Sequence, residues 1–315
     1  MPDPQVQFIA FLSNVNHSVE ALRLGDNFRV RGLPEKGGIA LITRLEGVGP
    51  EMAYERSEAQ FACLNRKEEK FFIAQKAYKL SPDQRAAIGR NEMPNMTEMI
   101  VDSIKLSMKL SLARLFQEGD IRAPLSYGII INKPDLKRVL KGIAANTIIS
   151  RIPFVLDADS APKVNEFVRT TDARTFRPYV QSAFKNFEES YSTHSERQAL
   201  TSLIASMEGL FHRPYAEKIS EEIATNCALL LGSTSSERTS IHSNVRRLYT
   251  RRSSILHDGN DQPVSRADLL MLRGYVREAV KKLVQTGVTK GELLGALGSG
   301  RSLSFMRGSV QGPKT

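Results

Sequence analysis

The feature that most constrains the fold is a series of apolar stripes in the second half of the chain. Apolar residues that recur three or four positions apart lie on one face of an α-helix. Such stripes cover residues 176–191, 200–211, 219–230 and 269–283. Ser265 and Asp268 have the spacing of a capping box before the fourth stripe. Thr289 and Glu292 repeat that spacing and begin a short last helix. Short connections between these helices predict an antiparallel helical bundle.

The first half of the chain has a different pattern, and residues 1–90 indicate mostly strands and turns. Candidate strands are residues 7–12, 27–31, 38–43 and 70–77, which alternate or run apolar between Gly, Pro and Asn. Residues 96–117 fit a strand or a helix, but their length and composition favour a helix. Beyond them we expect a strand over 126–132, a helix over 135–145 that Pro134 begins, an apolar run over 148–156 and a helix over 163–170.

These patterns together predict an α+β protein in three parts. Residues 1–172 form a mixed, β-rich domain with some helices, which is expected to have a sensing or regulatory role. Residues 173–298 form an all-α helical domain. Residues 299–315 are rich in Gly and Ser with Lys and Arg, and are expected to be a disordered basic tail.

Composition narrows the class of function. The chain has 315 residues, a net charge of +10 and a pI near 9.6, which favours contact with nucleic acid, although ribosome-associated and merely basic proteins share this property. Cys63 and Cys227 match no metal spacing and favour a reducing cytosol. The five histidines fit no zinc motif, and no glycine-rich nucleotide loop is found, so we expect neither metal nor cofactor. No signal peptide or membrane span is found, so we expect a cytoplasmic protein without a membrane partner.

The stretch with the most chemical content is residues 245–260, VRRLYTRRSSILHDGN. Its apolar spacing predicts a helix from about residue 239 to a stop signal at Asp258, Gly259 and Asn260. Arg252 falls on the apolar stripe and His257 in the last turn, where the helix dipole favours a protonated imidazole. Such a pair suits phosphodiester cleavage, because His moves protons and Arg stabilises phosphate charge. The R-x4-H spacing alone also occurs by chance, and a histidine in a terminal turn is more often a cap.

The order of motifs around this stretch resembles that of the HEPN superfamily, and specifically its Apea-like branch. In that branch a helix that ends in leucines and glycine leads into one with the pattern Y-x-x-R-S-x-I-x-H-x-G. The matching positions here are Tyr249, Arg252, Ser253, Ile255, His257 and Gly259. Residues 199–211 resemble the preceding helix of the family, with Glu208 at its acidic position, and the similarity extends over about residues 176–284. The chain departs from the pattern at Glu221, Glu222 and Asn226, in a helix that often carries an arginine in the family.

The resemblance implies a metal-independent endoribonuclease that acts as a homodimer through its HEPN domain. RNA carries its own nucleophile, the 2′-hydroxyl. The resemblance implies that His257 would either deprotonate this hydroxyl or protonate the leaving oxygen. Arg252 would stabilise the charge that develops on the phosphate. Apea-like proteins act as toxins in anti-phage defence by abortive infection, so the resemblance also implies a phage-derived trigger and an RNA substrate, with transfer RNA as a candidate.

Five further residues receive supporting roles. Tyr249 and Ser253 are candidates for orienting groups, and Glu208 for a carboxylate that holds Arg252 or His257. For Tyr249, Ser253 and Glu208 a contact that only packs or caps a helix is an equal alternative. Arg247 and Arg251 are expected to add phosphate contacts with little sequence information.

Two other functions remain as alternatives. The first is a non-catalytic HEPN dimer that binds RNA or a nucleotide as a scaffold or sensor, although the presence of both Arg252 and His257 favours the enzyme. The second is the antitoxin-paired type, in which a tyrosine two residues after the histidine is modified. Gly259 stands at that position, which disfavours this type.

Overall fold

A computed structural model describes residues 5–60, 63–90, 92–131, 137–141, 152–193, 195–213, 217–257 and 263–299 of the chain. The side chains of residues 59–60, 137–141 and 256–257 fall outside this description, as do residues 300–315 of the expected tail. The chain divides into two compact units, Met1–Thr171 and Asp172–Thr315, which we call unit 1 and unit 2. This division lies one residue from the domain boundary expected after residue 172.

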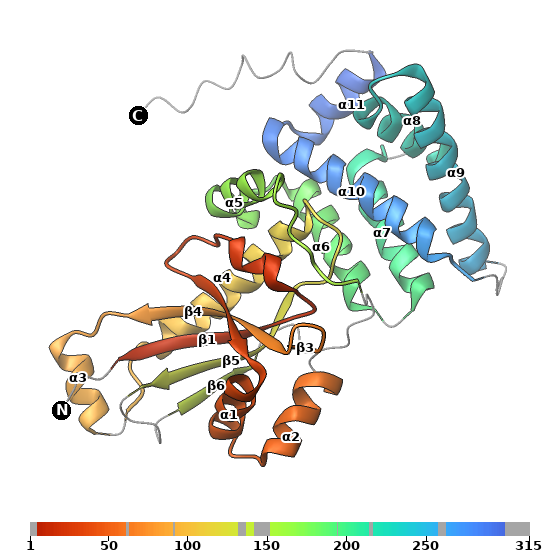
Figure 1. Ribbon diagram of the computed structural model, residues 1–315. Coiled ribbons are helices and arrows are strands. Elements are labelled where there is room, and N and C mark those ends of the chain that lie inside the picture. The colour runs from red at the N-terminus through yellow and green to blue at the C-terminus, as the bar shows by residue number, and fades with distance from the viewer. Residues whose placement is uncertain are drawn as a thin grey trace, which may run out of the picture. The chain divides into compact units, whose positions relative to one another are not determined.

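Unit 1 is built on an antiparallel sheet. Its strands are β1 (Val6–Ser13), β2 (Arg29–Pro34), β3 (Leu64–Asn65), β4 (Lys70–Tyr78), β5 (Arg122–Ile130) and β6 (Lys137–Lys141). They lie in the order β2-β4-β1-β5-β6, and β3 pairs with the start of β4 on the edge opposite to β2 (Figure 1). The central strand β1 is buried along almost its whole length, so its apolar run faces protein on both sides.

Helices cover the two faces of this sheet, and the alternation of side chains decides which residues each helix contacts. On one face, Ile9 and Phe11 of β1 belong to an apolar cluster with Ile42 and Leu45 of α1 (Glu35–Glu46) and residues near α2 (Pro50–Glu55). On β5, Tyr127 points into that cluster. The next residue, Gly128, points to the opposite face, where α4 (Met96–Arg114) brings the Met99 side chain so close that a Cβ atom would not fit. Unit 1 therefore has a helix–sheet–helix layering.

The edge strand β2 is protected by a side chain. Glu20 lies in a short 3₁₀ helix, His17–Ala21, and its carboxylate accepts a hydrogen bond of 2.7 Å from the backbone N–H of Gly32. A Cβ atom at position 32 would lie 2.5 Å from that carboxylate oxygen, so the contact requires glycine. Arg29 and Arg31 are exposed on the same strand. The N–H group of Gly32 that could pair with a further strand is thus already satisfied.

Two sequence predictions for unit 1 are wrong. Residues 38–43, expected to be a strand, belong to helix α1, in which Gly38, Ile42 and Leu45 share the buried face. A short apolar run fits either structure. Here the helix is favoured by charges that suit its dipole, Glu35 in the first turn and Arg44 in the last, and it ends at the left-handed Gly47 (φ 69°). Residues 1–90, expected to be mostly strands and turns, also contain α2 and α3 (Pro82–Gly89).

The second wrong prediction is the helix over residues 135–145. Residues 137–141 form strand β6, which pairs antiparallel with β5; residues 132–136 and 142–151 lie outside the described residues. The strands expected over 7–12 and 70–77 are confirmed within β1 and β4, and β2 begins two residues later than expected. The strand expected over 126–132 is confirmed as far as Ile130, where β5 ends. The helices expected over 96–117 and 163–170 are confirmed as α4 and α5 (Ala161–Thr170).

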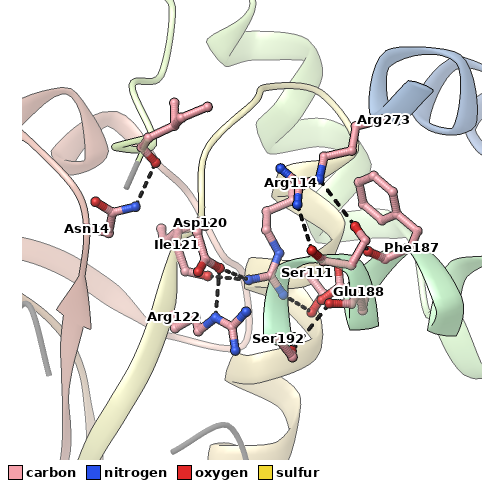
Figure 2. Close-up of polar contacts among 12 residues, drawn as sticks. Asn14, Ser111, Arg114, Asp120, Ile121, Arg122, Phe187, Glu188, Ser192 and Arg273 are labelled. Carbon is pink, nitrogen blue, oxygen red and sulfur yellow. Dashed lines mark hydrogen bonds and ion pairs between the residues drawn. The ribbon is translucent and has the colours of Figure 1, made fainter. Parts of the chain in front are cut away.

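A buried charge cluster joins the end of α4 to the start of β5 (Figure 2). Asp120 is fully buried and accepts hydrogen bonds of 3.1 Å from Arg114 and 2.7 Å from Arg122. Arg114 also donates to the carbonyl oxygen of Ile121 at 2.8 Å. Buried carboxylates persist in proteins when they are paired and hydrogen-bonded in this way, so the cluster sets the angle between the helix and the strand.

In its described part, unit 2 consists of helices alone. The longer ones are α6 (Pro178–Ser192), α7 (Glu196–Phe211), α8 (Ile219–Leu231), α9 (Ser235–His257), α10 (Arg266–Thr286) and α11 (Lys290–Gly298). The four predicted stripes are confirmed as buried faces of α6, α7, α8 and α10, and Thr289 with Glu292 forms a complete capping box before α11. Helix α6 packs along α7, α8 packs along α9, and α10 contacts α6, α7 and α8. The protein is therefore of mixed α+β class. None of the described helices combines the length and apolar character that a membrane span requires.

Candidate functional site

The candidate site is carried by α9, whose first turn is fixed by local hydrogen bonds. The Glu237 carboxylate accepts from the backbone N–H groups of Ser233 (2.7 Å) and Thr234 (3.1 Å), and the Thr234 hydroxyl accepts from the N–H of Glu237. Just before this turn, a Cβ atom on Gly232 would lie 2.9 Å from the backbone nitrogen of Arg238 and 3.0 Å from the carbonyl oxygen of Ala228. The sharp connection from α8 to α9 therefore requires glycine, and the helix begins four residues earlier than expected.

Three residues anchor the middle of α9 in the bundle. Val245 and Leu248 are completely buried, and Ile241 nearly so, as the apolar spacing predicts. Their burial turns the opposite face of the helix, with Ser243, Arg246 and Thr250, to solvent. The arginines between these faces lie at the flanks, where each meets a different environment.

Arg247 and Arg251 both pair with one carboxylate, Asp268 in the first turn of α10. Arg247 Nη2 lies 2.7 Å from Asp268 Oδ1, and Arg251 Nη1 lies 3.0 Å from Asp268 Oδ2. Arg251 also donates to the carbonyl oxygen of Pro263. The hydrogen bond from Arg247 is the main reason that the pKa of Asp268 is held below its usual value. We name this group, Arg247, Arg251 and Asp268, the Asp268 clamp.

The clamp changes the interpretation of two sequence features. The Ser265 hydroxyl accepts from the N–H of Asp268 at 3.1 Å, as the capping spacing predicts, but the Asp268 carboxylate binds the two arginines instead of completing the box. The two arginines expected to contact phosphate are therefore partly neutralised in this state.

Tyr249 and Glu208 form a second contact between helices. The Tyr249 hydroxyl donates to Glu208 Oε1 at 2.8 Å, so the acidic residue of α7 binds the tyrosine. From the sequence, Arg252 or His257 was expected as the partner of Glu208. Burial, followed by the hydrogen bond to Glu208, raises the pKa of Tyr249 to about 12, and the positive charge of Arg252 opposes this rise. Arg252 thus lies close enough to Tyr249 to act on it electrostatically.

Arg252 differs from the other two arginines. No ion pair or side-chain hydrogen bond is found for it in the described part of the chain, whereas the other two pair with Asp268. Its side chain is half-buried, and its Nε atom, like that of Arg251, is completely buried without a hydrogen-bond partner among the described residues. Ser253, next to it, is also half-buried. A guanidinium in this position lacks the carboxylate that burial normally requires.

His257 is the last residue of α9, and its side chain lies outside the described residues. Five residues of α-helix advance about 7.5 Å along the axis and about 140° around it. On an ideal helix, side chains five residues apart therefore leave the axis in different directions. The sequence prediction that Arg252 and His257 form a pair depends on how far the terminal turn departs from this geometry, or on a second copy of the chain.

The sequence reasoning missed a group of contacts made by α8. Glu221 lies 2.9 Å from His242 Nε2 and 3.4 Å from Arg246, both on α9. Glu222 lies 3.4 Å from both His212 and Arg213, near the end of α7. The two acidic residues that depart from the family pattern thus hold α8 against its neighbours, and only tertiary contacts, which no local motif encodes, reveal this.

Asn226 is the third residue of α8 at which the sequence differs from the Apea-like pattern. Its side-chain amide also has a structural partner, because it donates to the carbonyl oxygen of Phe211 at 3.0 Å. Among the described residues, no group of three or more His, Cys, Asp or Glu side chains is placed to hold a metal ion. In comparisons with protein-family models, curated proteins and solved structures, no match to this chain was found.

Proposed function

We propose that the chain is a metal-independent endoribonuclease of the Apea-like HEPN type, with Arg252 and His257 as its catalytic residues. The observation that carries the proposal is the unequal pairing of the arginines on α9. Arg247 and Arg251 share Asp268, whereas Arg252 keeps a partly buried guanidinium without a partner in the described part of the chain. An arginine left in this state favours an anion with planar oxygen geometry, and a phosphodiester meets that requirement.

The proposed reaction uses the 2′-hydroxyl of RNA as nucleophile. His257 accepts the hydroxyl proton while the 2′-oxygen forms a bond to phosphorus and the bond from phosphorus to the 5′-oxygen breaks. A proton passes to the leaving 5′-oxygen, and Arg252 stabilises the charge on the non-bridging oxygens. The products are a 2′,3′-cyclic phosphate and a 5′-hydroxyl. No water or external co-reactant is consumed in this step.

We propose a homodimer because Arg252 and His257 diverge by about 140° on one ideal helix. Two copies of α9 that face each other would supply two arginines and two histidines to one cleft. The contact between Tyr249 and Glu208 would hold α9 against α7 beside Arg252, and Ser253 would offer a hydroxyl to the substrate. Arg247 and Arg251 would contact phosphate only after leaving Asp268.

The biological setting follows from the same resemblance and is proposed with it. The nuclease would stay inactive in the cytoplasm until a phage-derived trigger acts, with unit 1 as the sensing part, and would then cut RNA, with transfer RNA as a candidate substrate. This is the course of abortive infection.

The direct test incubates the purified full-length protein with total transfer RNA and messenger RNA in EDTA. Wild-type protein should leave cyclic-phosphate ends, and Arg252→Ala and His257→Ala should each lose cleavage. Arg246→Ala is the matched control, because Arg246 lies on the same helix but is exposed and pairs with Glu221; it should retain activity. Cleavage that needs magnesium, or that survives in Arg252→Ala, contradicts the mechanism.

A second readout covers a protein that does not cut RNA without its trigger. Expression of a restrained nuclease should slow growth once the trigger is supplied, and His257→Ala should remove this toxicity. A non-catalytic scaffold would bind RNA equally well with and without His257 and would show no toxicity that depends on it. This second outcome would identify the protein as a non-catalytic RNA-binding scaffold and would contradict the proposed enzyme.

A further inference from the structure

Helices α1 and α2 of unit 1 diverge from the turn that joins them, as Figure 1 shows. Between them lies a cleft of about 670 Å³. It is lined by Glu35, Lys36, Ile39, Ala40 and Thr43 of α1 and by Pro50, Glu51 and Tyr54 of α2. Protein pockets that bind small molecules have volumes of about 300–1,000 Å³. The cleft is thus large enough for a ligand, and the function proposed above makes no use of it.

The floor of the cleft is apolar and firmly supported. Ile39 and Tyr54 are partly buried and pack against the apolar cluster that fills one side of the sheet. Ala40 is exposed at the rim, where its small side chain leaves the cleft open. An apolar or aromatic group would bury surface against Ile39 and Tyr54 without any rearrangement of the core.

Two polar groups in the cleft lack partners. The Thr43 hydroxyl oxygen is buried and has no hydrogen-bond partner among the described residues. Glu35, two turns earlier on the same face of α1, is half-buried, and no ion pair or side-chain hydrogen bond is found for it in the described part of the chain. The Glu35 carboxylate can accept a hydrogen bond from a ligand, whereas the Thr43 oxygen is covered by protein.

The charges at the rim favour a cation over an anion. Glu51 adds a second carboxylate from the opposite wall, and Lys36 is the only cation among the lining residues. Lys36 is exposed, so its ammonium group is screened by water, whereas the Glu35 carboxylate is partly withdrawn from it. An amine in the cleft would therefore gain more from Glu35 than it loses to Lys36.

We propose that the cleft between α1 and α2 binds a small organic cation with an apolar or aromatic body. The body lies on Ile39 and Tyr54, and the amine approaches Glu35. The lining of α1 from Glu35 to Thr43 extends about 12 Å, and that of α2 from Pro50 to Tyr54 extends about 6 Å. A wall of less than two turns is too short for the i, i+4, i+7 anchors of a bound peptide helix, which favours a small molecule.

The test uses two probes with one skeleton and opposite charge, 4-phenylbutylamine and 4-phenylbutyrate, titrated into the full chain by calorimetry and ligand-observed NMR. The amine should saturate a single site, and the carboxylate should bind at least about tenfold more weakly. Glu35→Gln should weaken amine binding by about tenfold. Ala40→Trp should abolish it, because the indole fills the cleft from an exposed position. Glu55→Gln is the matched control, since Glu55 is an exposed acid of α2 that does not line the cleft.

Circular dichroism and a thermal melt establish that each variant is folded before binding is measured. Equal affinity for the amine and the carboxylate overturns the proposal, as does amine binding that persists in Ala40→Trp. Absence of saturable amine binding at millimolar concentration overturns it as well. Exclusive binding of a basic amphipathic peptide would replace the small molecule by a protein partner.

Discussion

Replacing Asp268 with Asn tests whether the Asp268 clamp has opposite effects on stability and on RNA binding. The amide keeps the shape of the side chain and leaves the Ser265 hydroxyl bonded to the backbone N–H of residue 268, so the change removes charge alone. The side chain of Asp268 is 10% exposed, and those of Arg247 and Arg251 are 49% and 25% exposed. The Arg247 pair is screened by water and contributes about 0.5 kcal/mol. The Arg251 pair is better shielded and contributes about 1.5 kcal/mol.

Asp268→Asn should therefore lower the free energy of unfolding by about 2 kcal/mol. In a unit of about 140 residues this corresponds to a decrease of about 6–8 °C in Tm, measured by scanning calorimetry on the full chain. The pKa of Asp268 is lowered in the folded state, so this stability is present above the unfolded pKa of about 3.9 and is lost as pH falls through the lower folded value. The difference between wild type and variant should accordingly shrink below about pH 4.

The same substitution releases two arginines, so RNA affinity at low salt should rise. If both arginines then contact phosphate, the slope of log K against log salt should steepen by about 1.4, at about 0.7 for each contact on a single strand. Arg247→Gln is the control, with a loss of about 0.5 kcal/mol and no steepening. A variant as stable as wild type at pH 7 would refute the assigned strength of the clamp. A lower affinity for RNA would refute the view that the clamp withholds the arginines from phosphate.

Two further predictions concern packing and titration. Gly38→Ala should lower stability by about 1–3 kcal/mol in chemical unfolding, because the added methyl group would overlap the Phe71 ring under α1, whereas Gly37→Ala, at an exposed position, should be tolerated. The raised pKa of Tyr249 means that its contact stabilises the fold fully below about pH 10 and that this stability is lost as pH rises towards 12. Burial also raises the pKa of Tyr179 to about 12, so ultraviolet titration should show the phenols of Tyr179 and Tyr249 near pH 12. Tyr249→Phe should remove one of the two and Glu208→Gln should shift one downward; an unchanged titration in both variants would contradict the assignment.

The helices of unit 2 could be predicted because their apolar stripes are long. Over two or more turns, a period of 3.6 residues cannot be mistaken for a period of two, and Ser265, Thr289 and Glu292 mark helix starts by local bonds alone. In unit 1 the segments are short. Residues 38–43 carry a six-residue run that fits either a strand or a helix. The position of this helix against the sheet depends on the close approach of Gly38 to Phe71, which is a contact between distant segments.

The candidate site divides in the same way. The position of Arg252 on the apolar stripe of α9 is visible in the sequence, because it depends on spacing within one helix. The partners of Arg247, Arg251 and Glu208 were not foreseen, since each lies on another helix 17 to 41 residues away. Whether Arg252 and His257 act together stays a prediction.

The bond between Glu20 and Gly32 has a consequence for how the chain behaves in a crowded cell. An open sheet edge can recruit the edge of a neighbouring molecule, and repeated recruitment leads to fibrous aggregates. Here a carboxylate occupies the donor at Gly32, and Arg29 and Arg31 place like charges along the strand, so a second copy approaching edge to edge would meet repulsion and a blocked backbone. Growth of the sheet at the β2 edge is thus hindered by one side chain.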